Sequence, residues 1–407
     1  MRRLGKIGFT VLTLCCALIL AAVGYCERVV PEAFTVAPGE SLHIGSIFDS
    51  RPTDSTLTAA SIRAEESYQA SLRLFGVLPV KTVTVTVSDV PSVTVCGTPF
   101  GIKLYTDGVL IVGADDVETA AGACNPATAA GLRVGDTIVA IDGKKMTTNE
   151  DVAAAINGCD GHALTVRIRR DGVDFDAAFT PVRQKDGGFR AGLWVRDSTA
   201  GIGMLTFYDP ARGVFAGLGH AVSDSDTGTT FSLSGGEIVP ATVFGVKKSV
   251  VGTPGELEGS FALGTLGRLS RNGEDGLYGI LTALPTEGIT MPVATKQQVH
   301  TGAAQVLTTV DGTHPALYTV EIEQIRYHSA AVTRHMNIRV TDPALLAQTG
   351  GIVQGMSGSP LIQNGKLIGA ITHVLVDDPT TGYAIFAENM LETAQTIANK
   401  GEIKDAS

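Results

Sequence analysis

Gly355-Met356-Ser357-Gly358-Ser359-Pro360 lies near the C-terminal end of the 407-residue chain and brackets a serine with glycines. The small flanking residues leave room for a substrate carbonyl, and the backbone N–H groups of Gly355 and Ser357 can turn toward its oxygen. A nucleophilic hydroxyl beside such oxyanion donors is what acyl transfer requires. The pattern therefore predicts Ser357 as the nucleophile, with Gly355 and Ser357 supplying the oxyanion hole. Ser359, directly before a proline, is the competing serine.

A candidate general base lies far upstream, in the apolar and glycine-lined stretch Gly217-Leu218-Gly219-His220. His220 precedes Ser357 by 357 − 220 = 137 residues, and this order is that of chymotrypsin-like enzymes rather than of subtilisins or α/β-hydrolases. A histidine base predicts that activity falls on acidification at roughly pH 6 to 7. A second histidine, His373, follows the serine turn, and both a substrate-pocket role and a structural role are open for it.

Residues 181–407 contain many short apolar runs separated by Gly, Asp and Ser turns, without helical patterns between them. This pattern indicates antiparallel β-structure. An amphipathic helix is expected at about Ala387–Asn399. We expect a mainly β protein whose C-terminal part is a chymotrypsin-like double β-barrel serine protease with a closing helix.

Residues 96–180 form a separate unit whose signature runs from Pro126 to Gly143, P-A-x-x-A-G-L-x-x-G-D-x-I-x-x-I-x-G. It resembles a PDZ domain of the type linked to bacterial proteases. Such a domain adds an extended peptide as a strand along an exposed edge and holds its carboxylate with backbone N–H groups. Phe100, Gly101, Ile102 and Lys103 match the loop and strand that would do this. The alternative is that they only fill the core.

The N-terminal part is expected to export the protein. Arg2, Arg3 and Lys6 precede an apolar run from Ile7 to Tyr25, which is long enough to cross a bilayer with its basic end inside. Residues 1–27 are therefore a membrane anchor or a cleaved signal segment. Residues 28–95 are expected to be a polar, loosely structured stalk up to residue 65, followed by a small β-unit.

Charge and cysteine content exclude some partners. The net charge of −10 argues against nucleic acid, because no basic stripe is present to displace counterions from phosphates. No Cys or His cluster has zinc spacing, so neither a metal nor another cofactor is expected. Cys96, Cys124 and Cys159 allow at most one disulfide in the PDZ-like unit, and buried free thiols are the alternative.

The chain resembles the SpoIVB peptidase family of endospore-forming bacteria. The resemblance rests on Leu74-Phe75-Gly76-Val77-Leu78-Pro79, on Asp197-Ser198-Thr199-Ala200-Gly201-Ile202-Gly203, on the His220 stretch and on Gly351–Pro360. It implies an exported serine peptidase in the space between forespore and mother cell, which cleaves itself and a regulator of an intramembrane protease. It also points to Asp342, 357 − 342 = 15 residues before the serine, as the acid that orients His220.

Alternatives stay open for the acid and for the function. Asp342 precedes Pro343 and can serve as a structural turn residue instead, while Asp224 and Asp226 are other possible acids. Protein or peptide substrates, including the chain itself, are the expected partners, together with a membrane at the N-terminal helix. A non-catalytic PDZ scaffold would not need both the serine and the histidine motif. An HtrA-like quality-control protease would place its protease before its PDZ unit, which is the reverse of the order here.

Overall fold

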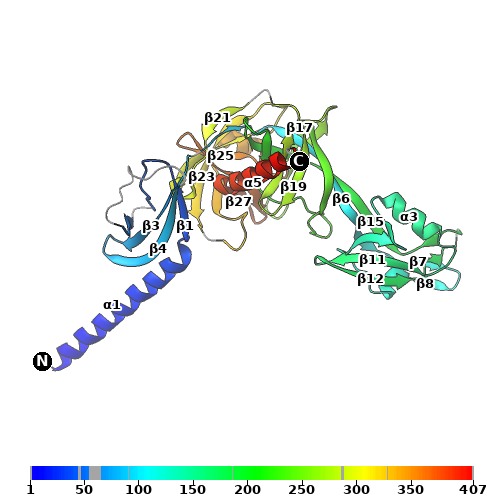
Figure 1. Cartoon of the computed structure of the whole chain (residues 1–407), viewed down its shortest axis with the longest axis horizontal. Helices are drawn as coiled ribbons and strands as arrows, with labels where there is room; N and C mark the ends of the chain where they lie inside the picture. Colours follow the sequence, from blue (N-terminus) through cyan, green and yellow to red (C-terminus); the bar gives the residue numbers. More distant parts are fainter. Residues whose placement is uncertain are drawn as a thin grey trace.

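The computed structural model describes residues 2–405 except 45–46, 55–65, 90, 186, 286–287 and 328, with side chains from 13 to 399. The molecule is elongated, with an N-terminal helix at one end, the PDZ-like unit at the other and a larger β-body between them (Figure 1). The N-terminal helix is α1 (Arg2–Val29). Over the residues described here, no helix is long and apolar enough to cross a membrane.

A four-stranded sheet follows α1. Its order is β1-β4-β3-β2, and its strands are β1 (Ala33–Val36), β2 (Phe48–Pro52), β3 (Ser67–Leu74) and β4 (Leu78–Val87). Alternate residues of β4, such as Val83 and Val85, are fully buried, as expected for a sheet with one covered face. Two strands come from the segment expected to be a loose stalk. β1 is ordered there because Phe34 and Val36 are buried in the core of this sheet.

The larger body contains two rings of paired strands. In the first ring the order is β6-β17-β19-β20-β16-β15, and the pairing of β15 with β6 closes it. Its strands are β6 (Pro99–Ala114), β15 (Leu193–Tyr208), β16 (Val214–Gly217), β17 (Leu233–Lys247), β19 (Gly267–Gly273) and β20 (Gly276–Leu281). β5 (Ser92–Val95), β18 (Glu256–Phe261) and β21 (Ile289–Pro292) extend this sheet at its margins.

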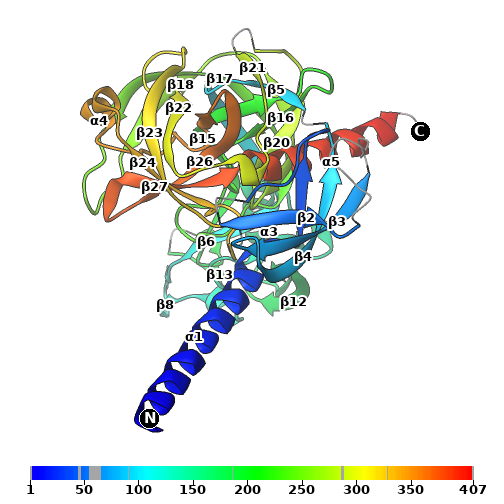
Figure 2. The same cartoon turned by 90° about the vertical axis from the view of Figure 1, so that its left-hand side faces the viewer.

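The second ring is a closed six-stranded barrel of order β22-β23-β24-β27-β26-β25. Its strands are β22 (Gly302–Thr308), β23 (Ala316–Ile325), β24 (Met336–Val340), β25 (Pro360–Gln363), β26 (Lys366–Leu375) and β27 (Asp378–Phe386). A short helix, α4 (Pro343–Thr349), precedes the serine turn. The C-terminal helix α5 (Ala387–Asp405) lies beside β16 and β20 (Figure 2). It buries Met390 and Ala394 against residues of both rings, such as Val214 and Ala370.

The PDZ-like unit at the far end is built on β6 and β15, which run to it side by side from the body. It adds α2 (Pro126–Ala129), α3 (Asn149–Asn157), β9 (Thr137–Ile141), β10 (Lys144–Lys145), β11 (Leu164–Arg170) and β12 (Val173–Phe179). The short pairs β7 (Val117–Thr119) with β8 (Gly122–Cys124) and β13 (Val182–Arg183) with β14 (Phe189–Arg190) flank it.

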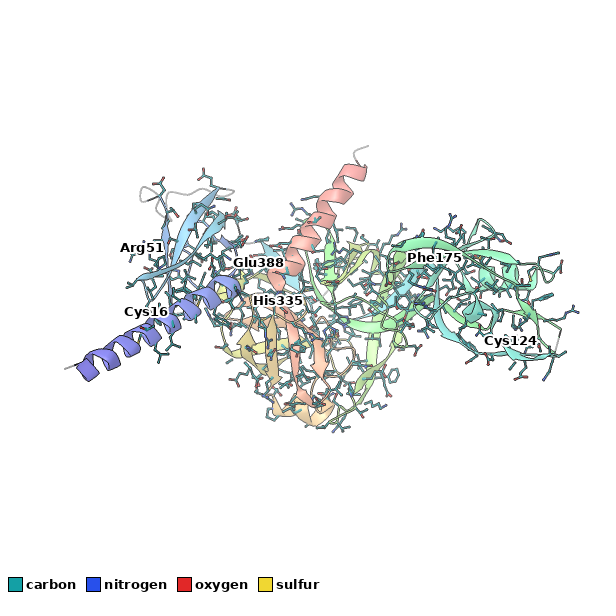
Figure 3. The ribbon with its side chains drawn as sticks, turned by 90° about the horizontal axis from the view of Figure 1, so that it is seen from below. Cys16, Arg51, Cys124, Phe175, His335 and Glu388 are labelled. Atoms are coloured by element: carbon teal, nitrogen blue, oxygen red, sulfur yellow. The ribbon has the colours of Figure 1, made fainter. Side chains whose placement is uncertain are left out.

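None of the six cysteines forms a disulfide in the structure. Cys96 and Cys159 are buried thiols, and burial raises the pKa of Cys96 to about 12. Cys124 is exposed at the end of the molecule opposite to Cys16 of α1 (Figure 3).

Candidate active site

Ser357 lies in a tight turn between α4 and β25. Gly358 has φ +89°, and a Cβ there would lie 2.2 Å from the carbonyl oxygen of Met204 and 2.4 Å from the nitrogen of Leu218. Only glycine fits this position, because both neighbours are backbone atoms. The turn thereby presses against β15 and the start of the His220 loop. The half-buried hydroxyl of Ser357 donates a hydrogen bond of 3.0 Å to the carbonyl oxygen of Thr372 on β26.

The competing serine has a different environment. Ser359 is fully buried, and its Oγ lies 2.8 Å from Oγ1 of Thr308 and 2.6 Å from the carbonyl oxygen of Met356. A hydroxyl held by two internal partners and closed off from solvent stabilises the turn and is not accessible to a substrate. The geometry therefore favours Ser357 as the reactive serine.

The predicted oxyanion donors are available. Within the described part of the chain, the N–H groups of Gly355 and Ser357 donate no backbone hydrogen bond, whereas the N–H of Gly358 donates to Ile371 at 2.8 Å. Gly355 adopts φ +95°, which brings its backbone into a conformation that other residues rarely adopt. These two unused donors, one of them on Ser357 itself, suit a developing oxyanion.

His220 follows β16 on a left-handed turn, because Leu218 has φ +66° and Gly219 φ +70°. Its Nδ1 lies 2.7 Å from the carbonyl oxygen of Ala221. A carbonyl only accepts, so Nδ1 carries the hydrogen and Nε2 is left as the proton acceptor. Burial lowers the pKa of His220, and the bond to Ala221 partly opposes this. The neutral imidazole that a general base requires is therefore favoured at neutral pH.

Asn272 holds the segment that follows His220, and no feature of the sequence indicates this role. Its amide accepts from the N–H of Val222 at 2.8 Å and donates to the carbonyl oxygens of Val222 at 2.9 Å and Phe231 at 3.0 Å. An asparagine in a glycine-containing turn looks like any other turn residue in the sequence. Its function becomes visible only when the two segments, about fifty positions apart, are seen to meet.

Ser357 and His220 come from different rings and meet at the same strand. Ser357 bonds to Thr372, and the ring of His220 lies 4.9 Å, centroid to centroid, from the ring of His373, the next residue on β26. In this structure the Ser357 hydroxyl bonds to Thr372 and not to His220. Burial, together with the charges of His220 and Arg334, lowers the pKa of His373 to about 4. His373 therefore lies beside His220, and its substrate-pocket role stays a prediction.

The structure does not bring Asp342 to His220. Asp342 is the N-cap of α4, where one carboxylate oxygen accepts from the N–H groups of Ala344 at 2.9 Å and Leu345 at 3.2 Å. The other accepts from the N–H of Thr319 at 3.1 Å. These bonds hold the pKa of Asp342 below its ordinary value. They match the structural alternative considered for this residue.

The two other acids are also engaged elsewhere. Buried Asp224 forms an ion pair with Arg196 and accepts from the N–H groups of Asp226 at 3.1 Å and Thr227 at 2.9 Å. Asp226 pairs with the same arginine at 2.9 Å. The contact that orients His220 is therefore the backbone carbonyl of Ala221.

The predicted peptide-binding residues Phe100, Gly101, Ile102 and Lys103 need correction. They lie in β6 with both edges occupied, by residues 200–203 of β15 on one side and 237–240 of β17 on the other. Lys103 also forms an ion pair with Glu237 at 3.0 Å. A strand paired on both edges cannot accept a peptide by β-augmentation.

A groove of about 780 Å³ lies instead between α3 and the first residues of β15. Val152, Ala153 and Ile156 of α3 form one wall, and Leu193–Val195 form part of the other. These β15 residues pair with β6 along one edge. Trp194, the chain's single tryptophan, is exposed at the groove and donates to Asp115 at 2.6 Å.

The fold and the site define a serine endopeptidase that carries a PDZ domain. A PDZ family model matches residues 123–170, and the model of SpoIVB peptidase S55 matches residues 187–391. The chain belongs to the SpoIVB peptidase S55 family. A search of curated proteins found no match.

Several solved structures are similar over part of the chain. A PDZ domain of an SdrC-like protein from Listeria monocytogenes has 20% identity, covers 22% of this chain and 87% of its own, and has a TM-score of 0.18. A protease from M. tuberculosis in its active form has 18% identity, coverages of 48% and 74%, and a TM-score of 0.29. The HtrA-type protease AlgW with a decapeptide has 15% identity, coverages of 51% and 55%, and a TM-score of 0.28. TM-scores this low support no further conclusion.

Proposed function

We propose that this chain is an exported endopeptidase of sporulation signalling, which cleaves itself and a regulator of an intramembrane protease. The observation that carries the catalytic part is the meeting of Ser357 and His220 at Thr372 and His373, one from each strand ring. This arrangement is typical of a chymotrypsin-like double barrel, in which the base and the nucleophile come from different barrels. The family membership supports the signalling role.

The catalytic step follows from the contacts. Ser357 turns its Oγ from Thr372 toward the substrate, transfers its proton to Nε2 of His220 and bonds to the carbonyl carbon. The N–H groups of Gly355 and Ser357 stabilise the oxyanion. His220 then gives the proton to the leaving amine, and water releases the acyl group by the same route in reverse. Ala221 holds the required tautomer, while Asp342 as the orienting acid stays a prediction that its N-cap contacts do not support.

The PDZ domain is proposed to guide the chain's protein substrates. Support comes from the groove between α3 and Leu193–Val195, whose apolar wall and strand residues suit an extended segment. Placement in the space between forespore and mother cell membranes is a proposal that rests on the family membership. The basic start and apolar run of residues 2–25 support the N-terminal segment as an anchor or a cleaved signal.

Self-cleavage tests this function directly. The full chain, produced as wild type and as Ser357→Ala, is incubated alone and mixed, with a tag only on the inactive copy. We expect fragments from the wild type, none from the variant alone, and tagged fragments in the mixture. Equal fragmentation of both proteins alone would show that another protease cuts the chain, and would contradict the proposal.

A further inference from the structure

The strand beside Ser357 has an open edge where a substrate can lie. β25 pairs with β26 only up to Ala370. The serine turn then forms backbone hydrogen bonds with the next residue of β26, Ile371. Beyond it, the pairing with β27 shifts register at Thr372 and continues with His373 and Val374, and among the described residues no strand pairs with the other side of this segment. The carbonyl of Thr372 on this open side holds the Ser357 hydroxyl. An extended substrate paired along this edge therefore passes directly over the nucleophile.

The side chains next to this edge are basic. One part of the His373 side chain reaches solvent while its ring packs near His220, and His373 pairs across the strands with Tyr383. The guanidinium of exposed Arg334 lies 5.0 Å from the Tyr383 ring centroid. Thr372 donates to the carbonyl oxygen of Thr333 at 2.7 Å, which keeps the segment carrying Arg334 against β26. Both basic groups are thus fixed beside the path of the substrate.

No carboxylate of the described chain balances these groups. Arg334 forms no ion pair with any described residue, in contrast to Arg339 on the following strand, which binds Glu323 and Asp378. The charge of Arg334, and that of His220 when it is protonated, oppose a positive charge on His373. The guanidinium of Arg334 is therefore free to bind a carboxylate supplied from outside the chain.

We propose that His373 and Arg334 form a specificity subsite that selects an aspartate or glutamate within about three residues of the scissile bond, roughly 10 Å of extended chain. The imidazole and the guanidinium both donate to the substrate carboxylate, and such charge-assisted bonds are stronger than neutral ones. The subsite rests on the endopeptidase activity of Ser357 and adds the class of sequence that the enzyme cleaves.

Matched peptides test the subsite. Internally quenched peptides spanning a self-cleavage site carry either Glu or Gln at each of the three positions on both sides of the cut. For the wild-type full chain we expect kcat/KM at least about tenfold higher for Glu at one of these positions, because a hydrogen bond to a charged group is worth about 1.5–3 kcal/mol. Arg334→Gln and His373→Asn should each reduce the Glu-to-Gln ratio, and Arg334→Glu should favour Lys at that position.

Arg268→Gln is the control, since Arg268 is an exposed arginine on β19 that forms no ion pair among the described residues. It should keep the wild-type ratio. Equal rates for Glu and Gln at every position, or a ratio unchanged in both subsite variants, would overturn the subsite while leaving the endopeptidase intact. Failure of the wild type to cleave any peptide or itself would overturn both.

Discussion

At the scale of single residues, the site depends on what each polar group is already bonded to. Ser357 and Ser359 are two positions apart, yet one is half-buried beside unused N–H donors and the other is enclosed. The same holds for the groups that were candidates to orient His220. The carboxylate of Asp342 is hydrogen-bonded to the N-terminus of a helix, whereas the carbonyl oxygen of Ala221 is hydrogen-bonded to His220.

Replacing Asp342 separates its two possible roles. We expect Asp342→Asn to keep kcat/KM within about tenfold of wild type, because asparagine caps helices nearly as well as aspartate. Asp342→Ala should lower the free energy of unfolding by about 0.5–2 kcal/mol through the lost cap. Kinetics beside thermal melts measure both. A loss of several orders of magnitude in folded Asp342→Asn would return this residue to the triad.

The pH dependence reports on His220. The base works only when neutral, and burial lowers its pKa, so the neutral form persists below the ordinary value of 6.5. We therefore expect the acid limb of kcat/KM to lie below pH 6.5, lower than the sequence alone predicts. A pH profile on an uncharged peptide checks this. A midpoint at or above 6.5 would contradict the half-buried imidazole of His220 as the base.

At the scale of elements, glycines and strand edges determine where the reactive groups lie. The glycine pattern around Ser357 is local, so the sequence alone was enough to propose this serine as the nucleophile and the N–H groups of Gly355 and Ser357 as its donors. An aspartate before a proline gives the same sequence pattern whether it caps a helix or orients a histidine. The sequence alone could therefore not assign the role of Asp342. Phe100–Lys103 were misassigned because their partners in β15 and β17 lie about 100 and about 140 positions away in the sequence.

Replacing Gly358 tests the close contact between the serine turn, β15 and the His220 loop. Gly358→Ala puts a Cβ against backbone atoms of β15 and the His220 loop, so both stability and activity should fall markedly. Gly365→Ala is matched, because Gly365 also has positive φ, +72°, but nothing lies within 4 Å of its Cβ position. It should lose only about 1–2 kcal/mol of stability and keep its activity. Similar loss of activity in both variants would contradict the tight contact.

At the scale of the whole molecule, β15 joins the two functional regions. Its first residues line the groove beside α3, and farther along the N–H of Met204 donates to the carbonyl of Ser357 at 2.9 Å. A sequence pattern could identify the PDZ unit and the protease separately. It could not show that one strand serves both, because this depends on pairing between distant segments.

Ala153→Arg tests the groove without disturbing a core. Ala153 is exposed on α3 and lines the groove, so arginine should fill it and slow cleavage of the full-length Ser357→Ala chain added as substrate. Short-peptide hydrolysis serves as the reference rate. Ala154→Arg, also exposed on α3 but outside the groove lining, should behave like wild type. If both variants process the long substrate normally, the groove does not guide it.

The paired variants Ser357→Ala and Ser359→Ala, treated with a serine-directed fluorophosphonate and analysed by peptide mass spectrometry, test the central claim most directly. We predict that wild type and Ser359→Ala are labelled at Ser357 and cleave peptide, although Ser359→Ala melts earlier because Thr308 loses its buried partner. Ser357→Ala should fold normally, take no label and lose several orders of magnitude in rate. Labelling at Ser359, or near wild-type cleavage by folded Ser357→Ala, would contradict the account.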